Sequence, residues 1–237
     1  SVLFARDHLH RQADRRIFVR RCGRMRDRHL HRWPVLRQSG PMSMNPSLRQ
    51  LRRVCVFCGS SSGARPAYLA AARELGKLLA SRGIGVVYGG ASIGLMGALA
   101  DAALAAGGEV TGVIPRSLEE REIVHTGLSK LEIVKTLHER KALMATLADA
   151  FITLPGGVGT LDELSEMATW SVLGVHDKPC GILDVQDYFA PLFAFLDSAV
   201  AEGFVRPSQR EIFIRQTDAE VLLDRLQVRI RPSRSTR

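Results

Sequence analysis

The strongest constraint on the fold is a repeated pattern: a short apolar run ends near glycine, and a helical segment follows. The run VCVFCG begins at Val54, and apolar residues of 66–81 then recur at helical spacing until Gly83. The same pattern recurs in IGVVYGG followed by 95–106, and in AFITLPGG followed by 160–173. Strands that alternate with helices of this length indicate parallel strands joined by crossover helices. The sequence therefore predicts an α/β protein, a Rossmann-like doubly wound parallel sheet with helices on both faces, in a single domain.

The pattern continues through the rest of the chain. Further strands are expected at EVTGVIP, LEIVKT, KPCGILD and EIFIR. Further helices are expected at 137–149, 188–201 and 218–226, whereas 116–130 is polar and irregular.

Residues 1–43 differ from the rest of the chain in charge. They hold 11 arginines and 3 aspartates, and so carry +8 of the formal net charge of +9. Three interpretations remain open: a basic arm that contacts nucleic acid or acidic surfaces, an organelle-targeting segment, or a non-native extension ahead of a start at Met42 or Met44. We favour the extension, because MSMNPSLRQLRR leads directly into the first strand. A nucleotide-binding hydrolase domain is then expected at 44–228, with a polar tail at 229–237. Nucleic acid binding is not expected outside 1–43.

The cysteines and the hydropathy bear on location and cofactors. Two of the four cysteines, Cys55 and Cys58, form a C-x-x-C pair within an apolar run. Side chains alternate along a strand, so these two thiols should point to opposite faces, and no second pair supplies the remaining ligands of a zinc site. No apolar run approaches the roughly 18 residues that a membrane span needs. We therefore expect a cytoplasmic protein with no membrane segment, no metal and no redox cofactor.

Three of the predicted strands end in glycine loops. These loops are GSSSG from Gly59, GGASIGLMG from Gly89, and PGGVGTLDE from Pro155. The carboxyl ends of parallel strands meet at one edge of the sheet, where ligands bind. Each loop exposes backbone N–H groups at the start of a helix, which favours an anion, although a tight turn alone also explains glycine. None of the loops matches the P-loop or the dinucleotide fingerprint, which disfavours a nucleotide triphosphatase or a dehydrogenase.

Two groups of charged residues accompany these loops. Glu163, Glu166 and Trp170 share one face of the helix after the third loop, and we expect Glu163 on its first turn. The Glu163 carboxylate either takes part in chemistry beside a bound anion or offsets the helix dipole. Arg140 and Lys141 open an earlier helix within the segment HERK, where they either suit a phosphate or lie on a solvated helix start. Composition does not decide between these alternatives.

Together these motifs resemble the LOG (Lonely Guy) family of cytokinin riboside 5′-monophosphate phosphoribohydrolases, long mislabelled as lysine decarboxylases. The resemblance covers about 53–227 and includes CVFCGSSSG, VYGGASIGLMG, HERK and PGGVGTLDE. It implies hydrolysis of the N-glycosidic bond of a nucleoside 5′-monophosphate, either a cytokinin riboside monophosphate or AMP, to a free base and ribose 5-phosphate. It also implies no cofactor, and a homodimer with Trp170 near the subunit contact.

The resemblance also assigns roles to individual residues. Arg140 and Glu163 look like the catalytic pair. A carboxylate such as that of Glu163 suits this reaction, because cleavage builds positive charge on the ribose. Arg140 would hold the sugar or the phosphate, or help the departing base; which group protonates the base stays open. The expected phosphate and nucleotide site consists of Gly59, Ser60, Gly89, Gly90, Lys141, Gly156, Gly157, Val158, Gly159 and Thr160.

Three alternative functions accompany this hypothesis. A general AMP nucleosidase would use the same site with another base preference. A non-catalytic nucleotide or molybdenum-cofactor carrier on the same fold would bind without turnover, although the presence of both Arg140 and Glu163 argues against it. A lysine decarboxylase is poorly supported, because that chemistry needs pyridoxal phosphate held by a lysine Schiff base.

Overall fold

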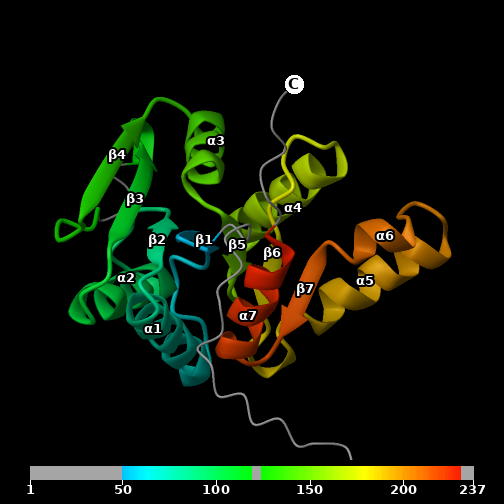
Figure 1. The fold of residues 1–237 in the computed structure, drawn as a ribbon, viewed down its shortest axis with the longest axis horizontal. Helices are drawn as coiled ribbons and strands as arrows, with labels where there is room; N and C mark the ends of the chain where they lie inside the picture. Colours follow the sequence, from blue (N-terminus) through cyan, green and yellow to red (C-terminus); the bar gives the residue numbers. More distant parts are fainter. Residues whose placement is uncertain (1–49, 119–123, 231–237) are drawn as a thin grey trace, which may run out of the picture. The chain divides into compact units, whose positions relative to one another are not determined.

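The computed structural model describes residues 50–118 and 124–230; the predicted extension 1–43 and nearly all of the tail 229–237 lie outside them. Within the described residues, seven strands form one parallel sheet in the order β4-β3-β2-β1-β5-β6-β7 (Figure 1). The fold is therefore the predicted doubly wound α/β sheet. The strands are β1 (Arg53–Phe57), β2 (Gly85–Tyr88), β3 (Val110–Pro115), β4 (Lys130–Val134), β5 (Ala150–Thr153), β6 (Cys180–Leu183) and β7 (Phe213–Gln216).

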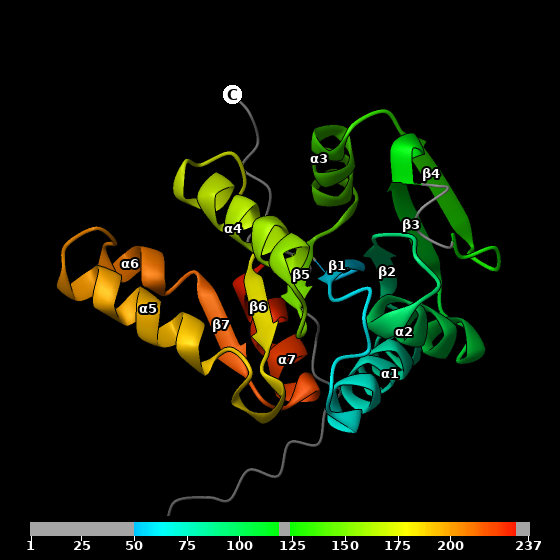
Figure 2. The same cartoon turned by 180° about the vertical axis from the view of Figure 1, so that it is seen from behind.

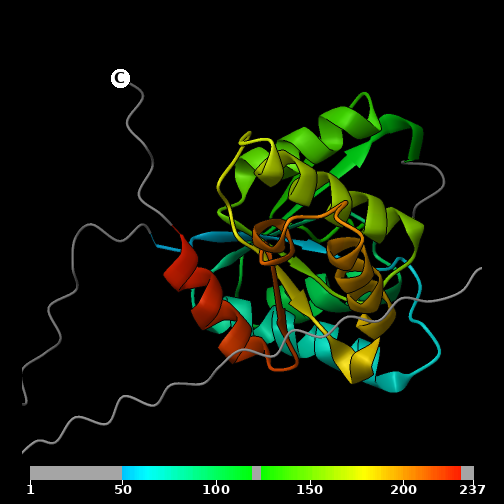
Figure 3. The same cartoon turned by 90° about the vertical axis from the view of Figure 1, so that its right-hand side faces the viewer.

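Helices cover both faces of the sheet. Helices α1, α2 and α7 pack on one face, and α3, α4 and α5 pack on the other (Figure 3). None of the described helices is both long and apolar enough to cross a membrane. The helices are α1 (Pro66–Ser81), α2 (Gly94–Ala105), α3 (Leu137–Leu147), α4 (Val158–Val172), α5 (Ala190–Ala201), α6 (Pro207–Arg210) and α7 (Ala219–Arg229), with short 3₁₀ turns at Arg116–Leu118 and Val185–Asp187.

The central strand β1 divides the core into two layers. Val54, Val56 and Cys58 pack into the layer beneath α1, α2 and α7. Cys55 and Phe57 pack into the opposite layer, beneath α3 and α4. This alternation confirms that the two thiols of the C-x-x-C pair lie on opposite faces. Burial raises the pKa of both thiols, and of Cys180 to about 12, so none is poised for thiolate chemistry at neutral pH.

Several helix boundaries differ from the predicted ones. Helix α3 ends at Leu147 rather than at Asp149, because the Asp149 carboxylate accepts the backbone N–H groups of Arg52 and Arg53 and thereby caps the start of β1. Helix α7 continues past the predicted end, and the following Ile230 is buried. The sequence did not predict α6, a single turn that begins at a proline.

The order of the strands creates a switch point beside β1. The chain adds β2, β3 and β4 on one side of β1, and then β5, β6 and β7 on the other. Strands β1 and β5 pair directly, from Val54 opposite Ala150 to Phe57 opposite Thr153 (Figure 2). In open α/β sheets the ligand crevice lies beyond the carboxyl ends of the strands at such a switch point. The fold therefore predicts a site between the first and third glycine loops.

Candidate functional site

The first and third glycine loops meet at the switch point. The backbone N–H of Gly59 donates to the carbonyl of Pro155 at 3.1 Å. A pocket of about 330 Å³ opens where the loops meet. The two loops and three side chains from other segments line it: Gly59, Ser60, Ser61, Gly63, Pro155, Gly156 and Gly157, with Tyr68, Leu95 and Tyr188.

The glycines of the third loop differ in whether packing of the protein excludes a side chain at their position. A Cβ on Gly156 would lie 2.1 Å from the Thr160 hydroxyl and 2.8 Å from the Gly59 nitrogen, so close packing of the two loops excludes a side chain there. A Cβ on Gly157 or Gly159 would meet nothing within 4 Å. Neither of these two has the positive φ that favours glycine. Packing of the protein itself therefore does not require them, whereas close approach of a ligand to the backbone would.

The loop leads into the N-terminus of α4, where no side chain caps the helix. Gly157 is the N-cap residue and makes no side-chain cap hydrogen bond. Backbone N–H groups in the first turn of a helix have no partner within the helix. Among the described residues, no acceptor contacts those of Val158, Gly159 or Thr160. Free donors and the positive end of the helix dipole suit an anion such as a phosphate.

Glu163 lies on the second turn of α4 and not on the first, which corrects the predicted position. The helix begins at Val158, two residues before the predicted start, so its first turn contains no acidic residue. The side chain of Glu163 is 7% exposed. An acid that simply offsets the helix dipole is expected on the exposed first turn. The observed position therefore weakens that explanation of Glu163 and favours a role inside the crevice.

Arg140 reaches from α3 across the carboxyl ends of two strands. Its Nε donates to the Val113 carbonyl at 3.0 Å, and its Nη2 donates to the Gly89 carbonyl at 3.1 Å. A Cβ on Gly89 would lie 2.2 Å from Nη2, so the second loop needs glycine to admit the guanidinium. Arg140 is buried at 6% exposure, and two backbone carbonyls accept from its guanidinium. Arg140 therefore lies buried beside the carboxyl end of β2 and not on a solvated helix start, and its catalytic role stays a prediction.

The charges of Glu163 and Arg140 act on the same buried thiol. Burial is the main cause that raises the pKa of Cys55; the Glu163 carboxylate raises it further, and the Arg140 guanidinium opposes this rise. Glu163 also raises the pKa of Cys58 after the effect of burial. Both charges therefore act on the same thiol within β1, and that of Glu163 also acts on Cys58, which follows the strand. The two predicted catalytic residues come from α3 and α4, which pack on the same face of the sheet as the Cys55 side chain.

Lys141 joins α3 to α4. Its ammonium lies 2.8 Å from Asp162 and 2.6 Å from Glu166, and the side chain is 9% exposed. Burial lowers the pKa of Lys141, but hydrogen bonds and charge from the two carboxylates outweigh this and raise it overall. The lysine is therefore charged at neutral pH. Such an amine fits poorly as the lysine of a pyridoxal phosphate Schiff base, which needs the neutral form.

The remaining predicted residues divide between the loops. Ser60 is exposed at the pocket, Thr160 is buried on the first turn of α4, and Val158 is 84% exposed. Gly90 has a φ of 87°, and its carbonyl accepts the N–H of His125. The sequence did not identify the two pocket tyrosines, Tyr68 and Tyr188. They come from segments without a glycine motif, so only the three-dimensional structure places them here.

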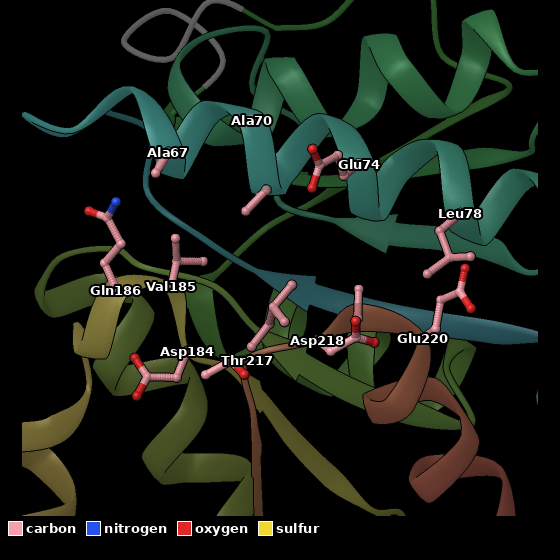
Figure 4. Close-up of a pocket in the computed structure, with 13 residues that line it drawn as sticks. Ala67, Ala70, Glu74, Leu78, Asp184, Val185, Gln186, Thr217, Asp218 and Glu220 are labelled. Carbon is pink, nitrogen blue, oxygen red and sulfur yellow. The ribbon is translucent and has the colours of Figure 1, made fainter.

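A second and larger cavity, of about 520 Å³, contains none of the predicted site residues. Ala67, Ala70 and Glu74 of α1 line one side of it, and Asp184 and Asp218 lie on the other side (Figure 4). No residue of the glycine loops lines it, so its size does not make it the better candidate. No group of three or more His, Cys, Asp or Glu side chains in the described ranges could hold a metal ion.

Comparison with known proteins connects this geometry to a family. A family model described as "Possible lysine decarboxylase" matches residues 96–226. A probable cytokinin riboside 5′-monophosphate phosphoribohydrolase of Oryza sativa subsp. japonica is 50% identical over 186 residues, 78% of this chain and 82% of the relative. A cytokinin riboside 5′-monophosphate phosphoribohydrolase of Arabidopsis thaliana is 49% identical over 178 residues, 75% of this chain and 78% of the relative.

Solved structures share the fold at lower identity. The molybdenum cofactor carrier protein of Chlamydomonas reinhardtii aligns with a TM-score of 0.58 and 20% identity, over 76% of this chain and 98% of that chain. The molybdenum cofactor binding protein of Rippkaea orientalis aligns with a TM-score of 0.58 and 21% identity, over 76% and 97% of the two chains. These likenesses show the fold alone.

Proposed function

The chain belongs to the family of cytokinin riboside 5′-monophosphate phosphoribohydrolases, and from this premise we propose that it hydrolyses a nucleoside 5′-monophosphate. Water attacks C1′ of the ribose as the N-glycosidic bond breaks. The bonding electrons leave with the base, which takes up a proton, and the second product is ribose 5-phosphate. The observation that carries the proposal is the uncapped N-terminus of α4, one turn before the buried Glu163.

The 5′-phosphate is proposed to bind where the first and third loops meet. The N–H groups of Gly157 through Thr160 are the donors, with Gly59 and Ser60 on the facing loop. Gly157 and Gly159 support this assignment, because open space surrounds both and a phosphate could approach their backbone closely. Lys141 would add positive charge to the site, and its ammonium also forms ion pairs with Asp162 and Glu166. A fixed phosphate holds the ribose, so remote binding energy serves the reacting carbon.

Glu163 and Arg140 are the proposed catalytic pair. As the bond to the base lengthens, positive charge builds on the ribose ring, and a nearby carboxylate stabilises it or orients the attacking water. Glu163 suits this role because it is buried and its charge is felt at the end of β1. The Arg140 guanidinium, fixed by two backbone carbonyls, would contact the sugar or the base beside Gly89 and Gly90.

The test is a direct assay of base release. Purified protein is incubated with a panel of nucleoside mono-, di- and triphosphates, including AMP and isopentenyl-adenosine monophosphate, and free bases are separated by chromatography. Release of base and ribose 5-phosphate from monophosphates alone supports the proposal. A preference for the isopentenyl substrate indicates a cytokinin-activating enzyme, and equal rates indicate general AMP nucleosidase activity. Release of no base from any nucleotide contradicts the proposal.

A non-catalytic carrier is the second candidate, because the chain shares its fold with two molybdenum-cofactor proteins. A carrier would bind the nucleotide or the cofactor and return it unchanged. Binding without turnover in the panel assay would favour this function over hydrolysis.

We also propose that the protein is a cytoplasmic homodimer. Three large apolar side chains are exposed near the end of α4, close in sequence to Trp170, and they support a subunit contact: Val172, Leu173 and Val175. Light scattering during size exclusion tests the mass of the particle in solution. Any nucleic acid binding would depend on residues 1–43, so deleting them should remove it.

A further inference from the structure

Tyr188 connects the segment after β6 to the third glycine loop. Its hydroxyl donates to the carbonyl oxygen of Gly156 at 2.5 Å. The ring packs edge-on against Tyr68, with the ring centroids 5.6 Å apart, and against Phe189, 5.0 Å apart. Tyr188 is partly exposed and lines the same pocket as Gly156 and Gly157.

The turn that presents Tyr188 is held in an unusual conformation. Gln186 and Asp187 have φ values of 54° and 57°, and they are the only non-glycine residues with positive φ in the described ranges. Such conformations persist only where the surrounding structure fixes them, and they concentrate at functional sites.

Contacts of charged side chains hold the turn in this conformation. Asp184 is fully buried; one of its oxygens accepts the backbone N–H of Phe189 at 2.9 Å, and the other accepts Nε of Arg215 at 2.6 Å. Arg215 also donates to the Asp187 carboxylate at 2.9 Å. From the other side, Arg65 contacts Gln186 at 3.4 Å. Both ends of the turn are thus tied to the sheet, and the Tyr188 hydroxyl is aimed at the glycine loop.

The hydrogen bond to the Gly156 carbonyl oxygen fixes the orientation of the whole peptide unit between Gly156 and Gly157. The peptide unit between Gly156 and Gly157 is planar and trans, so its C=O and N–H point in opposite directions. Fixing the oxygen therefore fixes the direction of the Gly157 N–H, the first donor at the uncapped end of α4. Glycine itself offers no resistance to rotation of this peptide, because it lacks the Cβ that limits φ and ψ.

We propose that Tyr188 is a positioning residue for the anion site: its hydroxyl holds the Gly156–Gly157 peptide in the orientation that binds the substrate phosphate. The inference deepens the proposed function and rests on it. Tyr188 acts through the backbone and does not itself need to touch the substrate.

The test substitutes Tyr188→Phe, which removes the hydroxyl and keeps the ring contacts. We expect the KM for the nucleotide and the Kd for inorganic phosphate, measured by calorimetry, to rise about 3- to 10-fold, the equivalent of one hydrogen bond. We expect kcat to change by less than about twofold, because the reacting carbon and Glu163 are untouched. The melting temperature should stay close to that of the unaltered protein.

The matched control is Ser81→Ala, which also removes a hydroxyl that donates to a backbone carbonyl, that of Leu78 at 2.8 Å, but at the C-terminal end of α1, away from the pocket. It should leave KM and phosphate affinity unchanged. Tyr188→Phe with unchanged KM and phosphate affinity overturns the inference, whether or not its melting temperature falls. Phosphate affinity separates the two proposals, because it can depend on Tyr188 even in a protein that releases no base.

Discussion

The two edges of the sheet carry similar residues, but helices end at one edge and begin at the other. The carboxyl edge holds three glycine loops, a pocket of about 330 Å³ and the side chains of Arg140 and Glu163. The amino edge also holds glycines and charges around a pocket of about 460 Å³, lined by Arg52, Arg53, Ala80, Gly83, Ile84, Gly85, Gly107, Gly108 and Glu109. Glycine content and cavity size therefore do not distinguish a ligand site from a turn.

Helix direction and backbone conformation do distinguish the edges. At the amino edge, α1 and α2 end, and Gly83 and Gly107 follow them with φ values of 66° and 78°, the left-handed conformation that terminates helices. Helix C-termini present carbonyl groups, which repel anions. At the carboxyl edge, α4 begins beside Gly157, whose φ is −95°, with N–H groups that no acceptor contacts within 50–118 and 124–230. The amino edge uses its glycines for turns, and the carboxyl edge leaves Gly157 free for a ligand.

The largest expected effect at the carboxyl edge comes from Glu163→Gln. The substitution removes the carboxylate charge and keeps the shape, so kcat for base release should fall by about 100-fold or more. Binding of AMP should persist, because the phosphate donors are unchanged. Rapid-quench measurement of base release and calorimetry with AMP check both parts. Unchanged turnover would remove Glu163 from the chemistry.

Arg140→Lys tests the second member of the pair. Lysine keeps the charge but cannot reach both the Gly89 and the Val113 carbonyl with one planar group. We expect kcat/KM to fall about 10- to 100-fold, as for lost hydrogen bonds of a charged donor. Arg53→Lys, on an exposed residue of the amino edge, is the control and should leave kcat/KM unchanged. Equal losses in the two variants would show that the edges do not differ in function.

Two glycine substitutions compare the edges directly. Gly157→Ala should raise the KM about tenfold with little change in stability. The added methyl group keeps the phosphate from approaching the backbone, so one charge-assisted hydrogen bond is lost. Gly107→Ala should lower the free energy of unfolding by about 1 kcal/mol, because alanine is strained at its positive φ, and should leave KM unchanged. Urea unfolding and steady-state kinetics on both variants check this. If Gly157→Ala lowers stability and spares KM, the third loop is a turn like those at the other edge.

The smallest expected effect is a pH dependence of stability that arises at the amino edge. His176 lies between α4 and β6; burial is the main cause that lowers its pKa, and the charge of Lys178 lowers it further. The unfolded chain therefore takes up this proton at higher pH than the folded protein. Its contribution to stability is present above about pH 6.5 and is lost as the pH falls below that value.

Substitution of His176 tests this linkage. His176→Phe keeps a ring beside Phe151 and removes the titration. Urea unfolding between pH 7.5 and pH 5 should show a smaller loss of stability in the variant than in the unaltered protein, with equal kcat/KM at pH 7.5. If the free energy of unfolding falls equally with pH in both proteins, groups other than His176 cause the loss of stability in acid.

The sequence predicted the architecture and the motifs but not the long-range contacts of the site. Strand and helix positions followed from local periodicity, which is why the strands of the sheet were identified. The start of α4 was missed because Gly157, Val158 and Gly159 are poor helix formers, and the loop contact with Gly59 overrides that preference.

Contacts between distant segments carry no local signal. Nothing in the order of residues indicates that the Arg140 guanidinium binds the Gly89 carbonyl, or that Tyr188 binds that of Gly156. The resemblance to the phosphoribohydrolase family named Arg140 and Glu163 as a pair, but it did not give the burial of either side chain. That burial is the physical reason to expect strong electrostatic effects at the site.

The hydrogen bond between Gly59 and Pro155 has a consequence for the order of folding. A nascent chain that has emerged only as far as α3 already contains the first and second loops, but β5 has not yet paired with β1. The donors at the start of α4 are then also missing, so phosphate affinity arises only after this non-local pairing. Nucleotide in the medium would consequently stabilise the completed domain while leaving shorter translation intermediates unaffected.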